Sequence, residues 1–316
     1  MALHRAHGNP RLGLALALAT AVLWGFLSIA LRLLLEGMDP FTITWYRLAA
    51  AALILGLYQA RRRRLPAVGK LGRGQWWLLV VALLGLVGNY VLFVWALDFV
   101  SPATAQLVIQ LAPLLFLLGA LVIFGERFSL IQWIGLVVLV GGLGLFFNRR
   151  LPDLFRLSGP EAIGVALVVV AAVVWAGYAL AQKQLLLDLS SVNVLWLVYV
   201  GSTVLLLPLA RPGQLLELTP FQLALLAFGV FNTLAAYGCF AEALAHWEAS
   251  RVSAVIALTP LVTIVAVYAL LAIWPDADVG ERLDSLGLVG SALIIAGSVM
   301  AALGSRDAKL EPVALD

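Results

Sequence analysis

Apolar runs of about 20 residues recur along the whole chain and constrain its fold more than any other feature. As a helix with a rise of about 1.5 Å per residue, such a run crosses the roughly 30 Å hydrocarbon core of a bilayer. The runs cover residues 12–31, 41–59, 76–97, 103–124, 131–148, 161–182, 192–210, 221–244, 253–274 and 285–304. Because lipid offers no hydrogen-bond partners, the backbone N–H and C=O groups of each run must bond to each other within the run, as they do in a helix. The chain is therefore expected to be an all-α membrane protein with ten transmembrane helices.

The composition supports this class and excludes others. Hydrophobic residues make up 63% of the chain and charged residues 12%, whereas soluble domains hold about half and about a quarter. The single cysteine, Cys239, cannot form an internal disulfide. Two of the three histidines, His4 and His7, lie in the N-terminal tail, and the sequence lacks the HExxH and GxSxG motifs. We therefore expect no enzyme activity, no metal site and no cofactor.

The distribution of basic residues predicts the orientation. The loop after the second run holds Arg61, Arg62, Arg63, Arg64, Lys70 and Arg73, whereas the loop after the seventh run holds only Arg211. Basic residues concentrate in cytoplasmic loops, so both termini are expected in the cytoplasm of an inner-membrane protein. The four consecutive arginines beside a membrane helix are interpreted as a topology anchor and not as a nucleic-acid site.

The two halves of the chain repeat each other. At an offset of about 150 residues, aromatic, proline and glycine positions coincide. The matched pairs are Trp24 with Trp175, Trp45 with Trp196, Tyr90 with Tyr237, Phe93 with Phe240, Pro113 with Pro260, Gly135 with Gly290 and Gly142 with Gly297. The stretch Gly-Glu-Arg also occurs twice, at 125–127 and 280–282, where Glu126 and Glu281 are expected to stabilise a helix N-terminus.

An odd number of helices in each repeat makes the second repeat enter the membrane from the opposite side. This inverted topology is characteristic of secondary transporters. The expected organisation is a cytoplasmic tail at 1–11, a first five-helix repeat at 12–148, a linker at 149–160, an inverted second repeat at 161–304 and a cytoplasmic tail at 305–316.

The pattern resembles a known family. Ten helices as five plus five, a Trp in helices 1 and 6, the prolines of helices 4 and 9, and the Gly-Glu-Arg stretches before helices 5 and 10 are similar to the EamA family of the drug/metabolite transporter superfamily. The resemblance spans about residues 12–304. It implies a carrier that moves a small metabolite, often an amino acid and often outward, through a cavity lined by helices 1, 3, 4, 6, 8 and 9.

Polar and aromatic residues within the runs are the candidates for this cavity, because a polar group at membrane depth faces protein or water. They are Trp24, Ser28, Asn89, Tyr90, Phe93, Gln106, Gln110, Trp175, Tyr178, Asn232, Tyr237, Phe240 and Thr259. An alternative for each polar residue is a hydrogen bond between helices, and for each aromatic residue a place at the membrane interface. Pro113 and Pro260 are expected to act as hinges.

Two ionisable residues within the runs are candidates for charge recognition or coupling. Arg47 either attracts a substrate carboxylate or extends to the headgroups. Glu242 couples protons, contacts a substrate amine, or forms a structural pair with His246 or Arg251. The predicted function is secondary active or facilitative transport of a small organic metabolite by alternating access. The alternatives are a membrane scaffold or receptor and a channel-like protein, and the chain is expected to act as a monomer or a homodimer.

Overall fold

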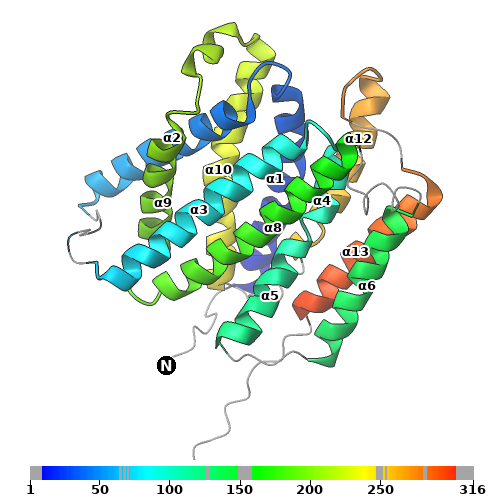
Figure 1. The fold of residues 1–316 in the computed structure, drawn as a ribbon, viewed down its shortest axis with the longest axis horizontal. Helices are drawn as coiled ribbons and strands as arrows, with labels where there is room; N and C mark the ends of the chain where they lie inside the picture. The colour runs from blue at the N-terminus through cyan, green and yellow to red at the C-terminus, as the bar shows by residue number, and fades with distance from the viewer. Residues whose placement is uncertain are drawn as a thin grey trace, which may run out of the picture.

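The computed structural model of this chain is helical throughout the residues that it describes, which are 9–63, 66, 69, 71–124, 129–148, 159–246, 252, 255–279 and 283–303. Ranges and labels follow Figure 1. The α-helices are α1 (Pro10–Leu34), α2 (Pro40–Arg61), α3 (Arg73–Ala96), α4 (Pro102–Val108), α5 (Leu111–Phe124), α6 (Leu130–Phe146), α8 (Pro160–Leu185), α9 (Ser191–Leu206), α10 (Pro220–His246), α12 (Thr259–Ile273) and α13 (Ser285–Leu303), and a 3-10 helix, η2, spans Pro212–Glu217.

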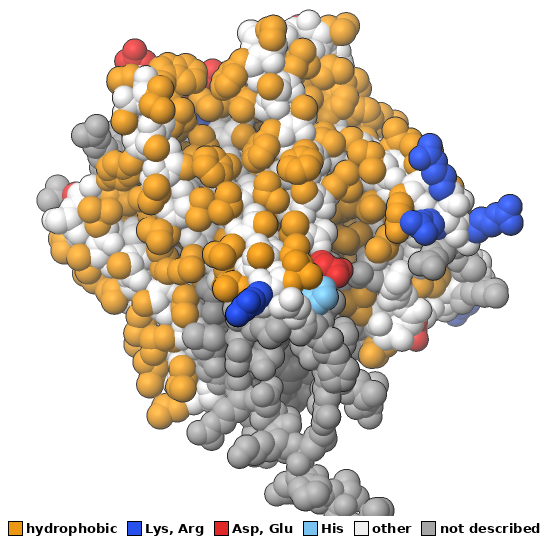
Figure 2. All heavy atoms as spheres, turned by 180° about the vertical axis from the view of Figure 1, so that it is seen from behind, with side chains coloured by type: hydrophobic (Ala, Val, Ile, Leu, Met, Phe, Trp, Pro, Cys, Tyr) orange, Lys and Arg blue, Asp and Glu red, His pale blue; other side chains and the backbone are white. Residues whose placement is uncertain are grey.

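These helices form a multi-pass membrane protein. Five spans are long and apolar enough to cross a bilayer by themselves: Arg11–Leu34, Pro40–Arg61, Arg73–Ala96, Pro160–Leu185 and Pro220–Phe240. Shorter apolar helices make up the remaining passes. Figure 2 shows a face covered mostly by apolar side chains, with few charged groups among them. Exposed large residues such as Trp77, Val122 and Val137 would be costly in water but are suited to lipid.

The two repeats pack against each other helix by helix. α3 of the first repeat packs on α8, which opens the second, and α1 packs in the same way on α10. α2 packs on α9, and α6 packs on α13 (Figure 1). Each contact therefore has a counterpart with the repeats exchanged, as a pseudo-twofold axis requires. The predicted fold of two inverted five-helix repeats is confirmed.

Reciprocal hydrogen bonds between α2 and α9 locate this axis. The indole nitrogen of Trp45 donates to the carbonyl of Thr203, and that of Trp196 donates to the carbonyl of Ala52, each at 3.1 Å. Trp45 and Trp196 are 151 residues apart in the sequence, and so are Ala52 and Thr203. The same bond is thus made twice, once in each direction.

The helix pairs α3–α8 and α1–α10 use equivalent positions with different residues. The Asn89 amide donates to the carbonyl of Ala171 at 3.1 Å, and the Thr20 hydroxyl donates to the carbonyl of Ala236 at 3.4 Å. Ala171 is the counterpart of Thr20, and Ala236 is the counterpart of Asn89. The same pair of positions is therefore hydrogen-bonded in both places, but the position that donates in one place accepts in the other.

The fourth and ninth passes are each interrupted by a turn. The expected continuous helix at 103–124 stops at Val108 and resumes at Leu111, and α12 starts only after a turn at 257–258. Proline cannot donate to the carbonyl four residues earlier, so Pro113 and Pro260 release the carbonyls of Ile109 and Ile256. The hydroxyl of Thr259 donates to the carbonyl of Ile256 at 2.6 Å. The carbonyl of Ile109 accepts from the amide of Ala112 at 2.8 Å.

The two breaks touch each other. The Gln110 side-chain amide in the first break donates to the carbonyl of Ala257 in the second, at 3.0 Å. Gln110 and Ala257 are 147 residues apart and occupy the same position of the two repeats. Equivalent positions can meet only near the pseudo-twofold axis, so the broken helices cross there.

The N-termini of α6 and α13 are capped by equivalent side chains. Ser129 accepts from the amide of Gln132, and Asp284, 155 residues further on, accepts from the amide of Gly287 at 2.7 Å. These residues fill the cap positions near which Glu126 and Glu281 were expected to act. Both glutamates, together with 1–8, 149–158 and 304–316 of the tails and linker, lie outside the described residues.

Glycines bring α6 and α13 into backbone contact within one chain. We call Gly135, Gly142, Gly290 and Gly297 the glycine seam. A Cβ on Gly142 would lie 2.7 Å from the amide nitrogen of Ile294, and one on Gly297 would lie 2.4 Å from that of Leu139. Only residues without a side chain allow this approach. The seam joins the last helices of the two repeats without needing a second copy of the chain.

The glycine seam gives a test with a matched control on the same helix. We expect Gly142→Ala to lower the free energy of unfolding by about 1–3 kcal/mol. The added methyl group meets backbone atoms of α13, so the two helices would have to move apart. Gly141→Ala should be neutral or slightly stabilising, since a Cβ there meets nothing within 4 Å. Thermal unfolding of the detergent-purified variants measures the difference. Equal melting temperatures for the two variants would contradict the seam.

Candidate transport site

An aromatic group lies where the halves meet. The rings of Tyr90 on α3 and Tyr237 on α10 stack with centroids 6.4 Å apart. These tyrosines are 147 residues apart, so the stack joins equivalent positions across the axis. Trp24 on α1 contacts Tyr237 edge-on at 5.5 Å and Phe240 at 5.9 Å. Four of the predicted cavity residues, from three helices, are thus brought into one group.

Arg47 on α2 adjoins this aromatic group. Its side chain is buried, with 3% of the residue exposed, so it turns into the protein and does not reach the headgroups. The guanidinium carbon lies 4.7 Å from the centroid of the Tyr90 ring. Nε donates to the hydroxyl of Thr233 on α10 at 3.2 Å, and the alkyl stem packs near Gly229. Arg47 therefore links the first repeat to the second.

Two phenol hydroxyls in the apolar cluster beside Arg47 form no hydrogen bond of normal geometry with a described residue. They belong to Tyr90, whose ring contacts the guanidinium, and to Tyr199 in the same cluster. Buried polar groups are paired in most proteins, so a group of orphans beside a buried cation is unusual. Sequence reasoning missed Tyr199. A tyrosine within the apolar run of α9 was the available signal.

The predicted polar residues mostly connect helices. Their donors go to backbone carbonyls: Gln106 to Trp24 at 3.1 Å, Gln110 to Ala257 at 3.0 Å, Asn89 to Ala171 at 3.1 Å, Asn232 to Leu23 at 2.6 Å, Ser28 to Gly25 at 3.2 Å and Thr259 to Ile256 at 2.6 Å. The first four bonds join different helices, as the interhelical alternative expects.

The remaining predicted aromatics lie around the central group. Trp175 contacts Tyr178 at 6.5 Å on its own helix and Phe116 at 6.5 Å on α5. Tyr178 is buried in the same apolar cluster as Tyr90 and Tyr237. Phe93 lies apart from them, against the cluster formed by Leu31 and its neighbours. The structure therefore unites the tyrosines and separates Phe93 from its counterpart, Phe240.

Glu242 is at the end of α10 and far more exposed than Arg47. Its carboxylate lies 3.1 Å from Nε2 of His246, one helical turn away, and 61% of its side chain is exposed. Arg251, the other expected partner, lies outside the described residues. Glu242 thus has a partner on its own helix and makes no ion pair with Arg47.

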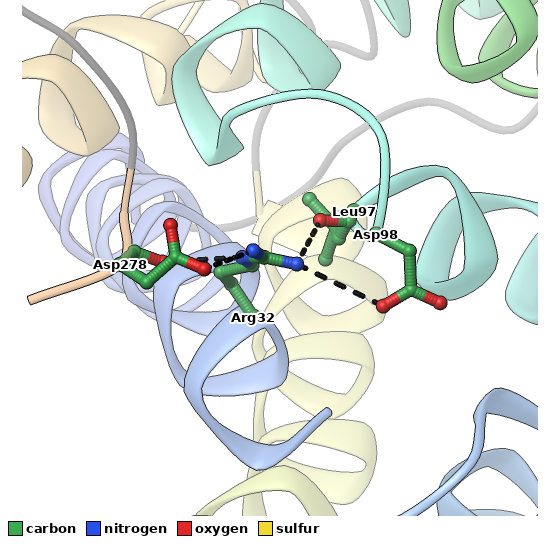
Figure 3. Close-up of polar contacts among 4 residues, drawn as sticks. All are labelled: Arg32, Leu97, Asp98 and Asp278. Carbon is green, nitrogen blue, oxygen red and sulfur yellow. Dashed lines mark hydrogen bonds and ion pairs between the residues drawn. The ribbon is translucent and has the colours of Figure 1, made fainter. Parts of the chain in front are cut away.

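Arg32 joins three segments at the end of α1 (Figure 3). It donates to the carbonyl of Leu97 at 2.8 Å and pairs with the carboxylate of Asp278. Asp98 lies 3.7 Å away in the turn after α3. Sequence reasoning missed both aspartates. Asp278 belongs to the largest insertion between the repeats, 274–279, which was the available signal.

Partial burial raises the pKa of the Asp98 carboxyl above its ordinary value, and the nearby Arg32 guanidinium lowers it by less. The charged form of Asp98 is therefore not favoured overall by this position. The main ionic partner of Arg32 is Asp278.

Comparison with known proteins identifies the family. The model of the EamA-like transporter family matches twice, at residues 11–148 and 162–303. The chain is 40% identical over 296 residues to an inner membrane transporter of Escherichia coli K12, YhbE, covering 93% of this chain and 92% of that one.

More distant relatives carry more specific names. A probable terminal-alkyne amino-acid exporter of Streptantibioticus cattleyicolor is 28% identical, with 89% of this chain and 90% of that protein covered. A probable amino-acid metabolite efflux pump of Salmonella typhimurium is 25% identical, with 92% and 95% covered.

A protein of known crystal structure shares the fold. It superposes with a TM-score of 0.60 at 18% identity, covering 93% of this chain and 98% of that one. The family and its named relatives are transporters and not enzymes, as expected. The chain belongs to the EamA-like transporter family and is a multi-pass membrane transporter.

Proposed function

We propose that this transporter exports a small organic metabolite of the amino-acid class across the inner membrane by alternating access. The observation that carries the proposal is the crossing of the two broken passes at the pseudo-twofold axis, where Gln110 binds the carbonyl of Ala257. Broken helices near the membrane midplane form the substrate sites of carriers built from inverted repeats. The names of the relatives from Streptantibioticus cattleyicolor and Salmonella typhimurium support an amino-acid-like substrate and export.

The Arg32 network supports a closed outer side. With both termini in the cytoplasm, as the basic loops indicate, α1 ends outside. Arg32 then ties α1 to the turn after α3 and to the segment before α13 on that side (Figure 3). We call these contacts of Arg32 with Leu97, Asp98 and Asp278 the outer latch. Release of an exported solute requires the latch to open.

One chain is the proposed transport unit, because both halves of the pseudo-twofold arrangement and the glycine seam lie within it. For proton coupling, the proposed residue is Glu242. Glu242 pairs with His246 near the end of α10, which faces the cytoplasm in the proposed orientation.

Reconstitution into proteoliposomes tests the transport proposal directly. We expect counterflow of at least one amino acid or close metabolite, above the level in empty liposomes, when the panel is screened with the purified protein. Absence of flux with every solute, together with tight binding of a protein partner, would favour a scaffold or receptor instead. Flux that rises without saturation would favour a channel.

The prolines test whether the breaks take part in transport. We expect the double variant Pro113→Ala, Pro260→Ala to insert and express normally but to lose most of its transport. Alanine restores the amide that can bond to Ile109 or Ile256 and continue the helix. Pro102→Ala is the control, because Pro102 follows the extended cap residue Ser101, so no helix can continue through this position. Normal flux in the double variant would refute the hinge role.

The outer latch gives a paired test on one arginine. Asp278→Asn should lower the melting temperature slightly, because exposed ion pairs contribute up to about 1 kcal/mol. Asp98→Asn should not lower it, since partial burial disfavours the charged carboxylate. A carboxyl with a raised pKa destabilises the fold only while it is charged. Any stability gap between Asp98→Asn and wild type should therefore shrink as the pH falls through that pKa, and a widening gap would contradict the assignment.

A further inference from the structure

Arg47 carries a charge that no described residue neutralises. A guanidinium keeps its proton in proteins, and this one is almost completely buried. Its described contacts are the Tyr90 ring and the Thr233 hydroxyl, both neutral. Within the part of the chain that the structure describes, Arg47 forms no ion pair, and its two terminal nitrogens find no hydrogen-bond acceptor. A buried cation without a counter-ion is costly, which requires an explanation.

The contacts that Arg47 does make fix its position without neutralising it. The Nε bond to Thr233 and the Tyr90 ring restrain the plane of the guanidinium. A cation–π contact stabilises by about 1–2 kcal/mol, which is less than the penalty of several kcal/mol per buried ion. These contacts leave the two terminal nitrogens free to donate, and their geometry suits a planar anion with two oxygens, such as a carboxylate.

The surroundings supply further donors for the same anion. The Tyr90 ring contacts the guanidinium of Arg47, and Tyr199 and Tyr237 pack in the same apolar cluster as Tyr90. The hydroxyls of Tyr90 and Tyr199 form no hydrogen bond of normal geometry with a described residue. The Tyr90 hydroxyl faces those of Tyr237 and Thr233, which are neutral. A phenol hydroxyl donates well to a carboxylate. Cation and unpaired donors thus occur together in one buried place.

Comparison of the two repeats shows that helix packing at this position does not require the charge of Arg47. The position equivalent to Arg47 in the second repeat is Val198, and the position equivalent to Thr233 in the first is Leu86. Both are buried, so the same architecture is completed there by apolar side chains. Arg47 and Thr233 therefore form a polar pair in only one of two equivalent places, as expected for a site that binds one asymmetric solute.

We propose that Arg47 binds the carboxylate of the transported metabolite, with the hydroxyls of Tyr90 and Tyr199 as additional donors. The inference rests on the proposed transport of amino-acid-like solutes and specifies its chemistry. Tyr90 contacts Arg47 and stacks with Tyr237, and Tyr237 contacts Trp24. The body of the solute then lies along these rings, whose faces also accept an ammonium group.

Binding to the detergent-purified full chain tests the site without relying on transport. The probes are two matched pairs, L-phenylalanine with L-phenylalaninamide and benzoate with benzamide, each measured by the shift in melting temperature. We expect a carboxylate to stabilise the wild type more than its amide. Arg47→Gln should weaken carboxylate binding by about thirtyfold or more, as expected when one partner of a buried charged pair is removed. Arg47→Lys should retain part of the binding because it keeps the charge.

The control is Arg62→Gln, directly after the end of α2. Arg62 also lies over a tyrosine ring, that of Tyr58 at 5.7 Å, but it is exposed. This variant should bind the carboxylates as wild type does. Without ligand, Arg47→Gln should be as stable as wild type or more so, because the buried charge is removed.

Three results would overturn the proposal. They are a clear loss of stability or of folding in ligand-free Arg47→Gln, equal carboxylate binding by Arg47→Gln and wild type, and no stabilisation of the wild type by either carboxylate at tens of millimolar. Transport of an amine or neutral solute that is unchanged in Arg47→Gln would refute the site and leave the transport function standing. Carboxylate binding that depends on Arg47, without flux in proteoliposomes, would refute the transport proposal alone.

Discussion

Close contact between the two repeats is the constraint on which the rest of the structure depends. In lipid, apolar side chains gain little by leaving their surroundings for one another, so helices associate through tight packing and interhelical hydrogen bonds. This chain uses both. Trp45 and Trp196 donate to carbonyls of the opposite repeat, and the glycine seam brings the backbones of α6 and α13 together.

The symmetry of these contacts separates structure from function. Where the repeats pack on each other, the same helix contact occurs twice. In α3–α8 the donor is Asn89 on α3, whereas in α1–α10 it is Thr20 on α1, the position equivalent to the acceptor Ala171. Where the repeats differ in polarity, one side carries Arg47 and the other a valine, Val198. A solute has no twofold symmetry, so its site must break the symmetry of the protein that holds it.

The outer latch and the glycine seam differ in burial and in strength. The outer latch holds three segments through a single arginine, Arg32, whose partners come from the turn after α3 and the insertion at 274–279. Its partly exposed ion pairs are individually weak. A weak closure is compatible with repeated opening, whereas the buried contacts of the glycine seam are suited to staying formed.

The sequence by itself determined the membrane class, the ten helices and the inverted repeat, because the length of apolar runs and the spacing of Trp, Pro and Gly are local properties that lipid makes decisive. It also indicated Arg47, Tyr90, Tyr237 and Trp24. Only the tertiary structure decided which donors are already used. It directed Gln106, Gln110 and Asn89 to backbone carbonyls, paired Glu242 with His246 and, among the described residues, gave Arg47 no ion-pair partner. Hydrogen-bond partners depend on which helices meet, and sequence spacing on one helix cannot specify the neighbour across the interface.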